Sequence, residues 1–364
     1  MKFTTTKDQL LRAITLADRV TGKNLSLSVL NHVVVSVSGG AASVRATNLD
    51  LGIEISLPVK SDANGVCALL GSILSSILNT SSNQDQVTVS INAGNAQVET
   101  QHSKTLVKSV PTDDFPNIPK IEKGNTFSIP VNDFVYGLRS VVYSAMVSSM
   151  KPELSSVYVT GKAGTLTFVA TDSFRLAEKI IPLKVGVDLP PILIPVKNTT
   201  DIIRVLEGEA GNVAVSVSEN QISFSTDSLY LTSRLTAGSF PDYRQIIPKK
   251  ATTEVIVLKQ DFLTALKRAA LFTNSFNQIH LAASGKKFSI ESSNQDVGET
   301  SESVPAATSG EPAAMNFNYR YVVDCFQSIP TDSVSLALHG ASKPMVVRGV
   351  GDNSFLYLVM PMNR

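Results

Sequence analysis

Several short segments of the chain alternate strictly between apolar and polar positions. The alternation is clearest in NVAVSVS, where small or polar residues separate Val213, Val215 and Val217. A period of two residues is typical of a strand that buries one of its faces. We therefore expect pairs of antiparallel strands in the segments that share this pattern, which are 86–100, 212–226 and 333–347.

Three other segments combine a short strand, an aspartate and a run of apolar residues at helical spacing. The segments are 1–20, 125–146 and 253–272, and their aspartates are Asp8, Asp133 and Asp261. An acid at this place suits a helix N-cap or first turn, where it interacts favourably with the helix dipole. The apolar faces that we expect these helices to bury are formed by Leu10, Leu11, Ile14 and Ala17, by Phe134, Leu138, Val141 and Val142, and by Phe262, Leu263, Leu266 and Ala270.

Two further landmarks complete an internal repeat. A strand runs into a polar turn at Thr47, Thr171 and Ser293, and a second helix is expected within 68–80, 196–208 and 318–330. All four landmarks recur in the same order, roughly every 125 residues. We therefore predict three homologous α+β domains, each with two helices packed on antiparallel sheets. Their predicted boundaries are 1–122, 123–248 and 249–364.

Composition narrows the class of protein. The chain has 364 residues, 43% of them hydrophobic, and a formal charge of +1, which excludes a disordered chain and a strongly basic nucleic-acid binder. The two cysteines, Cys67 and Cys325, lie far apart and form no CxxC motif, so we expect a reducing compartment, no disulfide and no zinc site. Neither a signal-peptide core nor a run of about 20 apolar residues occurs, which favours a cytoplasmic protein without membrane contact.

Enzyme chemistry has little support in the sequence. The histidines His32, His102, His280 and His339 lie in separate segments, and no metalloprotease, serine-hydrolase or Walker-type motif is present. The turn TDSFR at 171–175 allows two interpretations: a catalytic Asp-Ser-Arg cluster, or an Asx turn between two strands. The Asx turn is the better interpretation, because nothing in the sequence places a base beside a nucleophile.

The polar faces of the expected helices carry more cations than acids. Beyond the capping positions the acids are Asp18, Asp201 and Asp324. Such faces either meet phosphates as a mildly basic lining or are simply solvated, and charge alone favours the solvated face. No nucleic-acid-binding signature is present, which argues against sequence-specific base reading. The cations are Arg12, Arg19, Lys23, Arg139, Lys197, Arg204, Lys259, Lys267, Arg268 and Arg320.

The chain resembles a known family along its whole length. The segments that carry the likeness are MKF, LSLSVLNHVVV, ATDSFRLAEK, GSFPDYRQIIPK and YLVMPMNR. Together with the threefold repeat, they resemble the bacterial sliding clamps, the beta subunits of DNA polymerase III. The resemblance implies a non-enzymatic processivity factor without cofactor or metal. Two copies would form a head-to-tail homodimer, a ring of six domains, with helices lining the hole, strands outside and duplex DNA passing through without sequence specificity.

The resemblance also implies a site for partner proteins between the second and third domains. Polymerase, clamp loader and repair proteins of the family insert a peptide with Leu and Phe anchors into a pocket there. Two positions depart from the usual pattern: Phe174 stands where His is common, and Gln245 where a basic residue is common. The implied pocket residues are Leu154, Thr171, Ser173, Phe174, Arg175, Leu176, Pro241, Gln245, Ile246, Asn318, Tyr321, Met345, Leu358, Val359, Met360, Pro361, Met362 and Arg364.

Two more sets of residues follow from the resemblance. DNA-contact loops would contribute Lys23, Asn24, Ser148 and Lys151. The helix cations named above, with the exception of Lys259, would face the DNA as well. Ring closure would bring Thr105 and Val107 of one copy against Leu271 and Phe272 of the other. Two alternatives remain open from the residues themselves: a repeat scaffold that binds no nucleic acid, and a hydrolase that uses TDSFR and His280.

Overall fold

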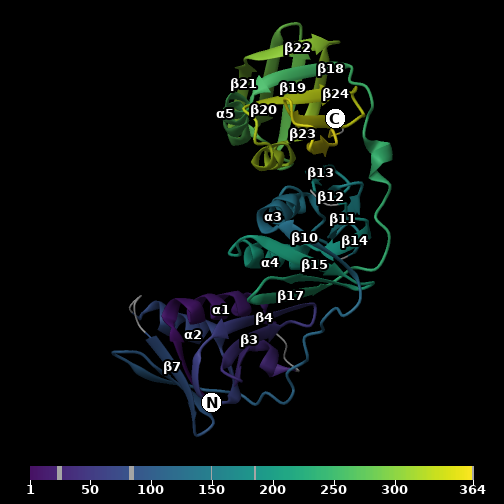
Figure 1. Ribbon diagram of the computed structural model, residues 1–364. Coiled ribbons are helices and arrows are strands. Elements are labelled where there is room, and N and C mark those ends of the chain that lie inside the picture. The colour runs from purple at the N-terminus through teal and green to yellow at the C-terminus, as the bar shows by residue number, and fades with distance from the viewer. Residues whose placement is uncertain (23–26, 82–85, 149, 184–185, 363–364) are drawn as a thin grey trace. The chain divides into compact units, whose positions relative to one another are not determined.

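A computed structural model describes the chain except for residues 23–26, 82–85, 149, 184–185 and 363–364 (Figure 1). The chain forms two compact units. Unit 1 comprises Met1–Asn132 and Thr200–Leu235, and unit 2 comprises Asp133–Thr199 and Thr236–Arg364. The middle sequence repeat is therefore divided between the units, whereas the first and third repeats each lie in one unit.

Unit 1 contains two antiparallel sheets and two complete helices. The five-stranded sheet has the order β5 (Lys60–Ala63), β1 (Lys2–Thr6), β7 (Gln86–Asn92), β8 (Asn95–Glu99) and β9 (Lys104–Val107). The eight-stranded sheet has the order β10 (Asn125–Pro130), β15 (Asn212–Val217), β16 (Gln221–Ser225), β17 (Leu229–Arg234), β4 (Leu51–Pro58), β3 (Ala41–Thr47), β2 (Val33–Ser38) and β6 (Gly65–Leu69). The helices are α1 (Lys7–Val20) and α2 (Gly71–Asn79), which lie side by side in Figure 1.

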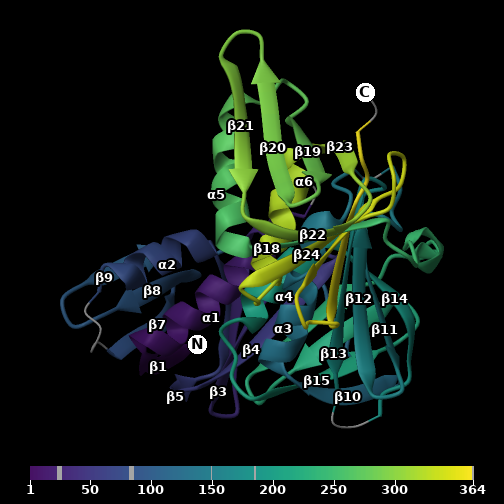
Figure 2. The same cartoon turned by 90° about the horizontal axis from the view of Figure 1, so that it is seen from above.

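Unit 2 repeats this arrangement with longer strands. Its nine-stranded sheet has the order β14 (Leu189–Pro195), β11 (Ser156–Lys162), β12 (Thr165–Thr171), β13 (Arg175–Pro182), β26 (Phe355–Val359), β25 (Met345–Gly349), β24 (Ser333–Leu338), β18 (Thr253–Leu258) and β22 (Ala306–Gly310). Its four-stranded sheet has the order β21 (Gly298–Val304), β20 (Lys287–Asn294), β19 (Gln278–Ser284) and β23 (Ala313–Asn318). Helix α5 (Lys259–Ala269) runs along β20 and β21 (Figure 2), and α6 (Tyr319–Asp324) follows β23.

The longest sheet of each unit joins two sequence repeats. In unit 1, β4 of the first repeat pairs with β17 of the second, with Ile53 opposite Leu231. In unit 2, β13 of the second repeat pairs with β26 of the third, with Leu176 opposite Leu358. All four side chains are buried, so the junctions between repeats are continuous with the cores.

The predicted amphipathic helices are present, with their aspartates in the first turn. Helix α1 begins after Thr6, whose hydroxyl accepts the Gln9 N–H at 3.5 Å. The remaining first helices are α3 (Val131–Arg139) and α5, with Asp133 and Asp261 in their first turns. The second helix of the middle repeat is α4 (Val196–Leu206), whereas that of the third repeat stops early at α6 and continues as a 3-10 turn over Cys325–Ser328.

Four residues assigned to the buried helix faces are only half-buried. Leu11 and Leu263 lie at the margins of the buried helix faces. The buried face of α1 includes Ala13 and Leu16 instead of Leu11, and that of α5 includes Ala265 instead of Leu263. Val142 and Ala270 lie beyond the ends of the α-helices, in 3-10 turns over Val142–Ser144 and Ala270–Phe272. The apolar period thus identified each helix but not the exact width of its buried face. The alternating residues Val213, Val215 and Val217 are all buried, as predicted.

Gly137 is a point where α3 closely approaches the sheet of unit 2. Phe134 on the same helix meets Phe168 edge-on, with ring centroids 5.5 Å apart at 76°. A Cβ added at Gly137 would lie 2.4 Å from Cε2 of Phe168, whose ring is fully buried and cannot retreat. We expect Gly137→Ala to destabilise unit 2 by about 1–3 kcal/mol through overpacking, more than the roughly 1 kcal/mol that alanine gains in a helix.

Scanning calorimetry tests this expectation. A loss of that size corresponds to a melting temperature lowered by roughly 2–12 °C for a unit of this size. Gly208→Ala is the matched control, because a Cβ at Gly208 meets no atom within 4 Å. Equal melting temperatures for Gly137→Ala and the control would contradict the packing argument.

Candidate functional site

The TDSFR segment forms an Asx turn between β12 and β13. Asp172 Oδ1 accepts the N–H groups of Phe174 at 2.9 Å and Arg175 at 3.0 Å. Thr171 Oγ1 donates to the Arg175 carbonyl at 2.6 Å and accepts the Ser173 N–H at 3.2 Å. These bonds hold Ser173 at a φ of 81°, in the left-handed region. The Asx-turn interpretation is confirmed, and the polar side chains of the segment are used to shape the backbone.

The same turn recurs in the first repeat. There, Asn48 Oδ1 accepts the Leu51 N–H at 2.8 Å and Thr47 Oγ1 accepts the Leu49 N–H at 3.0 Å. Leu49 has a φ of 79°, close to that of Ser173. The third repeat keeps one of these bonds, from the Asp296 N–H to Asn294 Oδ1 at 2.9 Å. The first two repeats therefore share the turn, and they differ in the side chain at its tip.

At the tip in the middle repeat, Phe174 is 60% exposed and lies beside the C-terminal segment. The Met360 N–H donates to the Phe174 carbonyl at 2.8 Å, and the Met362 N–H donates to the Asn316 carbonyl at 2.8 Å. The Phe174 ring stacks on Tyr321, with centroids 6.5 Å apart at 23°. We call Phe174, Tyr321, Met360, Pro361 and Met362 the C-terminal surface. It combines two aromatic rings with two flexible thioethers.

Arg175 supports the C-terminal surface through its contact with Tyr321. Its guanidinium lies 4.6 Å from the centre of the Tyr321 ring, its Nε donates to Asp172 Oδ2 at 3.0 Å, and it also pairs with Asp324. Burial alone would lower the pKa of Arg175, but its interactions with Tyr357, Asp324 and Asp172 raise the pKa above its ordinary value. Arg175 is therefore a fixed charge that positions Tyr321, and its side chain offers little surface to a ligand.

A buried apolar cluster lies next to the C-terminal surface. Its members are Val169, Leu176, Tyr243, Val346, Leu356 and Leu358, with Met360 packed against them. Tyr243 belongs to a 3-10 turn over Tyr243–Ile246 and donates its hydroxyl to Glu178. Burial, together with that contact, raises the pKa of Tyr243 above its usual value. Ile247, directly after the turn, packs against the cluster, whereas the side chain of Ile246 is exposed.

The implied pocket residues, all within unit 2, differ in exposure. The exposed ones are Ser173, Phe174, Pro241, Gln245 and Ile246, and the half-buried ones are Arg175, Asn318, Tyr321, Met360, Pro361 and Met362. The buried ones, which support the site without offering surface, are Leu154, Thr171, Leu176, Met345, Leu358 and Val359. Arg364 lies outside the described residues. Gln245 donates to Asp242 Oδ2 at 2.8 Å, so its amide is already partly engaged.

Sequence reasoning missed Phe276, an exposed aromatic residue next to this group. Asn318 Nδ2 donates to the Phe276 carbonyl at 3.3 Å, which places the Phe276 backbone beside a predicted pocket residue. The signal in the sequence was a single large apolar residue in the otherwise polar stretch TNSFNQ. A single exposed apolar residue is common on protein surfaces, so only its position beside Asn318 in the folded chain links it to this group.

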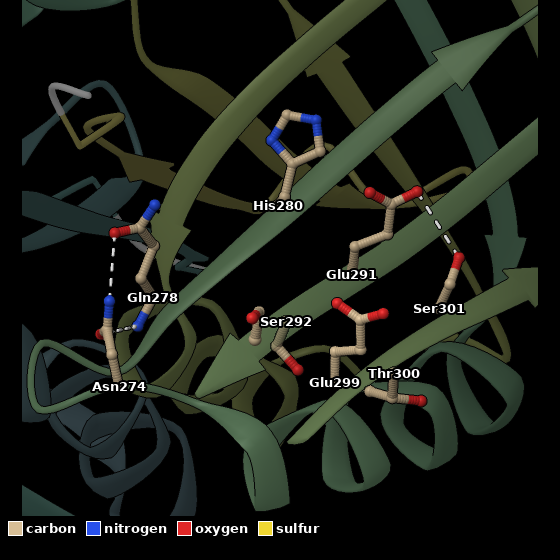
Figure 3. A pocket seen from close by; sticks show the side chains of 9 residues that line it. Asn274, Gln278, His280, Glu291, Ser292, Glu299, Thr300 and Ser301 are labelled. Atoms are coloured by element: carbon tan, nitrogen blue, oxygen red, sulfur yellow. Dashed lines mark hydrogen bonds between the residues drawn. The ribbon is translucent and has the colours of Figure 1, made fainter. Parts of the chain in front are cut away.

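A polar cavity in unit 2 contains His280 (Figure 3). It has a volume of about 620 Å³ and is lined by side chains of β19, β20 and β21 and by Asn274. His280 Nδ1 lies 2.7 Å from Asn316 Oδ1, so the ring has a structural partner. Among the described residues, none of the TDSFR segment lines this cavity. The hydrolase alternative needs TDSFR and His280 in one site, and this cavity contains only His280. No group of three or more potential metal ligands occurs in the described part of the chain.

The helix cations fall into two groups. Arg12 pairs with Glu209, Arg204 with Asp201 at 3.6 Å, and Arg268 with Glu302 at 2.8 Å, so these charges are partly neutralised. Lys259 donates to the Ile329 carbonyl at 2.7 Å. The exposed cations without an ion pair in the described part of the chain are Arg19, Lys197, Lys267 and Arg320. Arg139, Ser148 and Lys151 are exposed, whereas Lys23 and Asn24 lie outside the described residues.

The strands at the ends of the four sheets include β9 and β21. β9 ends the five-stranded sheet of unit 1 and β21 ends the four-stranded sheet of unit 2. On β9 the exposed apolar side chain is Leu106, at 56%, whereas Val107 points inward because neighbouring residues of a strand face opposite sides. The place of Val107 at the interface stays a prediction, and its side chain is buried in the single chain. Thr105 and Phe272 are half-buried, and Leu271 is 69% exposed.

Three family models match the chain in succession. They are the N-terminal domain of the DNA polymerase III beta subunit at 1–119, its central domain at 128–242 and its C-terminal domain at 244–363. In the described residues, no helix is long and apolar enough to cross a membrane.

Curated proteins and solved structures agree with the family models. The beta sliding clamp of Synechococcus elongatus is 26% identical over 373 residues, and that of Bacillus subtilis 25% over 382 residues. Both alignments cover 100% of this chain and 99% of the relative. A Bacillus subtilis sliding-clamp structure matches with a TM-score of 0.94 at 24% identity, covering 100% and 99% of the two chains. The Bartonella birtlesii subunit bound to griselimycin matches with a TM-score of 0.94 at 25% identity, covering 100% of both chains.

Proposed function

Because this chain belongs to the DNA polymerase III beta subunit family, the bacterial sliding clamps, we propose that it acts as the processivity factor of a replicative DNA polymerase. The predicted three-repeat α+β clamp fold is confirmed. The observation that carries the proposal is the run of three family models, which follow one another in the order of the repeats. We place the domain boundaries at 1–122, 123–248 and 249–364, and the site of action in the cytoplasm.

Two copies close head to tail into a ring of six domains. The free edges of β9 in one copy and β21 in the other pair with each other, which removes both exposed strand edges. Charge supports this pairing through Lys108, directly after β9, and Glu299 on β21, whereas Lys104 and Glu302 already pair with Glu99 and Arg268. Leu271 and Leu106 supply apolar surface that the ring covers.

Duplex DNA passes through the ring, with the helices facing it. Arg19, Lys197, Lys267 and Arg320 are the charges best placed to meet phosphates, because they are exposed and form no ion pair in the described part of the chain. Arg12, Arg204 and Arg268 contribute less, because each already has an acidic partner. A few free cations on a near-neutral chain attract DNA weakly, which suits sliding without sequence preference.

The C-terminal surface docks the polymerase catalytic subunit, the clamp loader and other proteins that carry a Leu- and Phe-anchored peptide. Exposed aromatic rings and methionines are suited to apolar anchors and can repack around different ones. The structurally similar Bartonella birtlesii subunit binds griselimycin. The proposed role is mechanical, and we assign no catalytic residue. A scaffold without nucleic acid and a hydrolase remain the competing functions.

DNA topology tests the proposal directly. The protein is loaded onto a nicked circular plasmid by its cognate clamp loader and separated from free protein by gel filtration at high salt, where phosphate contacts are weakened. We expect it to stay with the circle and to be lost after one restriction cut, because only a threaded ring depends on closed DNA. Equal retention on circular and linear DNA would contradict encirclement, and hydrolytic activity would favour the alternative.

A further inference from the structure

Unit 1 contains a cavity of about 220 Å³ beside the Asx turn of the first repeat. The turn between β3 and β4 forms one wall with Leu49 and Leu51, and the segment 116–119 forms another with Pro116 and Pro119. Strands β16 and β17 close it, with Arg234 at the end of β17. We call this the N-terminal cavity. It belongs to none of the sites described above.

The N-terminal cavity is the internal counterpart of the C-terminal surface. Leu49 occupies the position of Ser173 in the same hydrogen-bonded turn, with the same left-handed φ. The strand pairing also corresponds, since β4 meets β17 as β13 meets β26. One bond is reproduced closely: the Arg234 N–H donates to the Asp50 carbonyl at 2.8 Å, as the Met360 N–H donates to the Phe174 carbonyl at 2.8 Å.

The third wall corresponds as well. The segment FPNIP at 115–119 follows the first repeat as FPDYRQIIP at 240–248 follows the second. In unit 1 this segment is fixed by Tyr230, whose hydroxyl donates to the Pro119 carbonyl at 3.0 Å and accepts the Ile121 N–H at 3.2 Å. The prolines therefore hold a stable wall opposite Leu49. A built cavity with three matching walls is more than an incidental gap between strands.

The chemistry of the N-terminal cavity differs from that of its counterpart in one respect. Asp50 and Arg234 stand where Phe174 and Met360 stand in the C-terminal surface, so its rim is charged. Its lining is mixed: the apolar part is formed by Leu49, Leu51 and the two prolines, and the polar part by Thr47, Asn117, Gln221, Thr232 and Ser233. Its volume lies below the roughly 300–1,000 Å³ of sites for drug-sized ligands, and so suits one side chain. Leu49 is 42% exposed and forms the accessible part of the apolar wall.

We propose that the N-terminal cavity is a second docking site for the partner peptides that the C-terminal surface binds, and that it holds a single leucine anchor. This inference rests on the proposed function, since it assumes that partners present such peptides. The second site binds more weakly, because it lacks the paired aromatic rings. A partner with two such segments would thereby engage both sites of one chain.

Isothermal titration calorimetry with the synthetic peptide acetyl-Ala-Leu-Ser-Leu-Phe-amide tests the proposal on the full chain. We expect two binding events per chain, the second at least about tenfold weaker than the first. Leu49→Ala should abolish only the weaker event, and Phe174→Ala should weaken only the tighter one, by roughly 30-fold in Kd. Leu49→Gly is a second variant, because glycine adopts a φ of 79° without strain and so keeps the turn. Ile256→Ala, at 38% exposure and outside both sites, should change neither.

The outcomes separate the two proposals. A single event in the wild-type protein that Phe174→Ala weakens would overturn the second site and leave the proposed function intact. Two events that are both unaffected by Leu49→Ala and Leu49→Gly would also overturn the assignment to this cavity. No binding at all by the wild-type protein would contradict peptide docking itself, and with it the second site.

Discussion

Replacing Phe174 by alanine is expected to weaken binding of a Leu- and Phe-anchored peptide by about 2 kcal/mol or more, roughly 30-fold in Kd. Phe174 is the most exposed aromatic residue of the C-terminal surface, and its ring stacks on Tyr321. Removing the ring takes away one wall for an anchor and leaves Tyr321 without its stacking partner. Fluorescence anisotropy with a labelled peptide measures the change.

The same variant should leave folding unchanged. The Asx turn is held by Asp172 and Thr171 through the backbone, so it does not depend on the Phe174 side chain. The melting temperature should match that of Ile256→Ala, the matched control with a truncated exposed side chain elsewhere in unit 2. Undiminished peptide affinity in Phe174→Ala would place the docking site away from the C-terminal surface.

Leu271→Asp is expected to convert the dimer to monomers at micromolar concentration. Leu271 is 69% exposed in the single chain, and ring closure would bury it next to the β21 edge. Burying an unpaired carboxylate there costs about 2 kcal/mol at each interface. A closed ring has two such interfaces, so the dimer Kd should rise by roughly a thousandfold.

Sedimentation velocity over a range of concentrations measures this change. Leu258→Asp serves as the control, because Leu258 is also exposed but lies at the end of β18, away from both free edges. The Leu271→Asp monomer should keep its peptide affinity and lose retention on circular DNA. A dimer of unaltered strength would rule out Leu271 as an interface residue.

Much of the fold was predictable because the sequence repeats its own pattern. The aspartates Asp8, Asp133 and Asp261 identified the start of each first helix, since a charge in the first turn follows a local rule. The alternation in NVAVSVS identified β15, because the two-residue period of a strand is also a local rule. The turn at Thr171 was also predictable, because its hydrogen bonds join residues within five positions of one another.

Exposure was harder to predict because it depends on distant parts of the chain. Leu176 and Leu358 are far apart in sequence and bury each other across the β13–β26 pair, so the family pattern alone could not distinguish them from exposed pocket residues. That Val107 is buried and Leu106 exposed was not evident from the sequence, because the phase of a strand decides which neighbour points outward. Phe276 was missed because only the folded loop brings it beside Asn318.

The sharing of sheets between repeats has a consequence for how the chain folds during synthesis. β4 cannot complete its pairing until β17 has left the ribosome, and β13 must wait for β26 of the following repeat. Such long sequence separations slow folding, because a large loop closes before the contact is gained. The nascent chain therefore exposes unpaired strands during its synthesis, and the proposed docking surface forms only after β26 has been made.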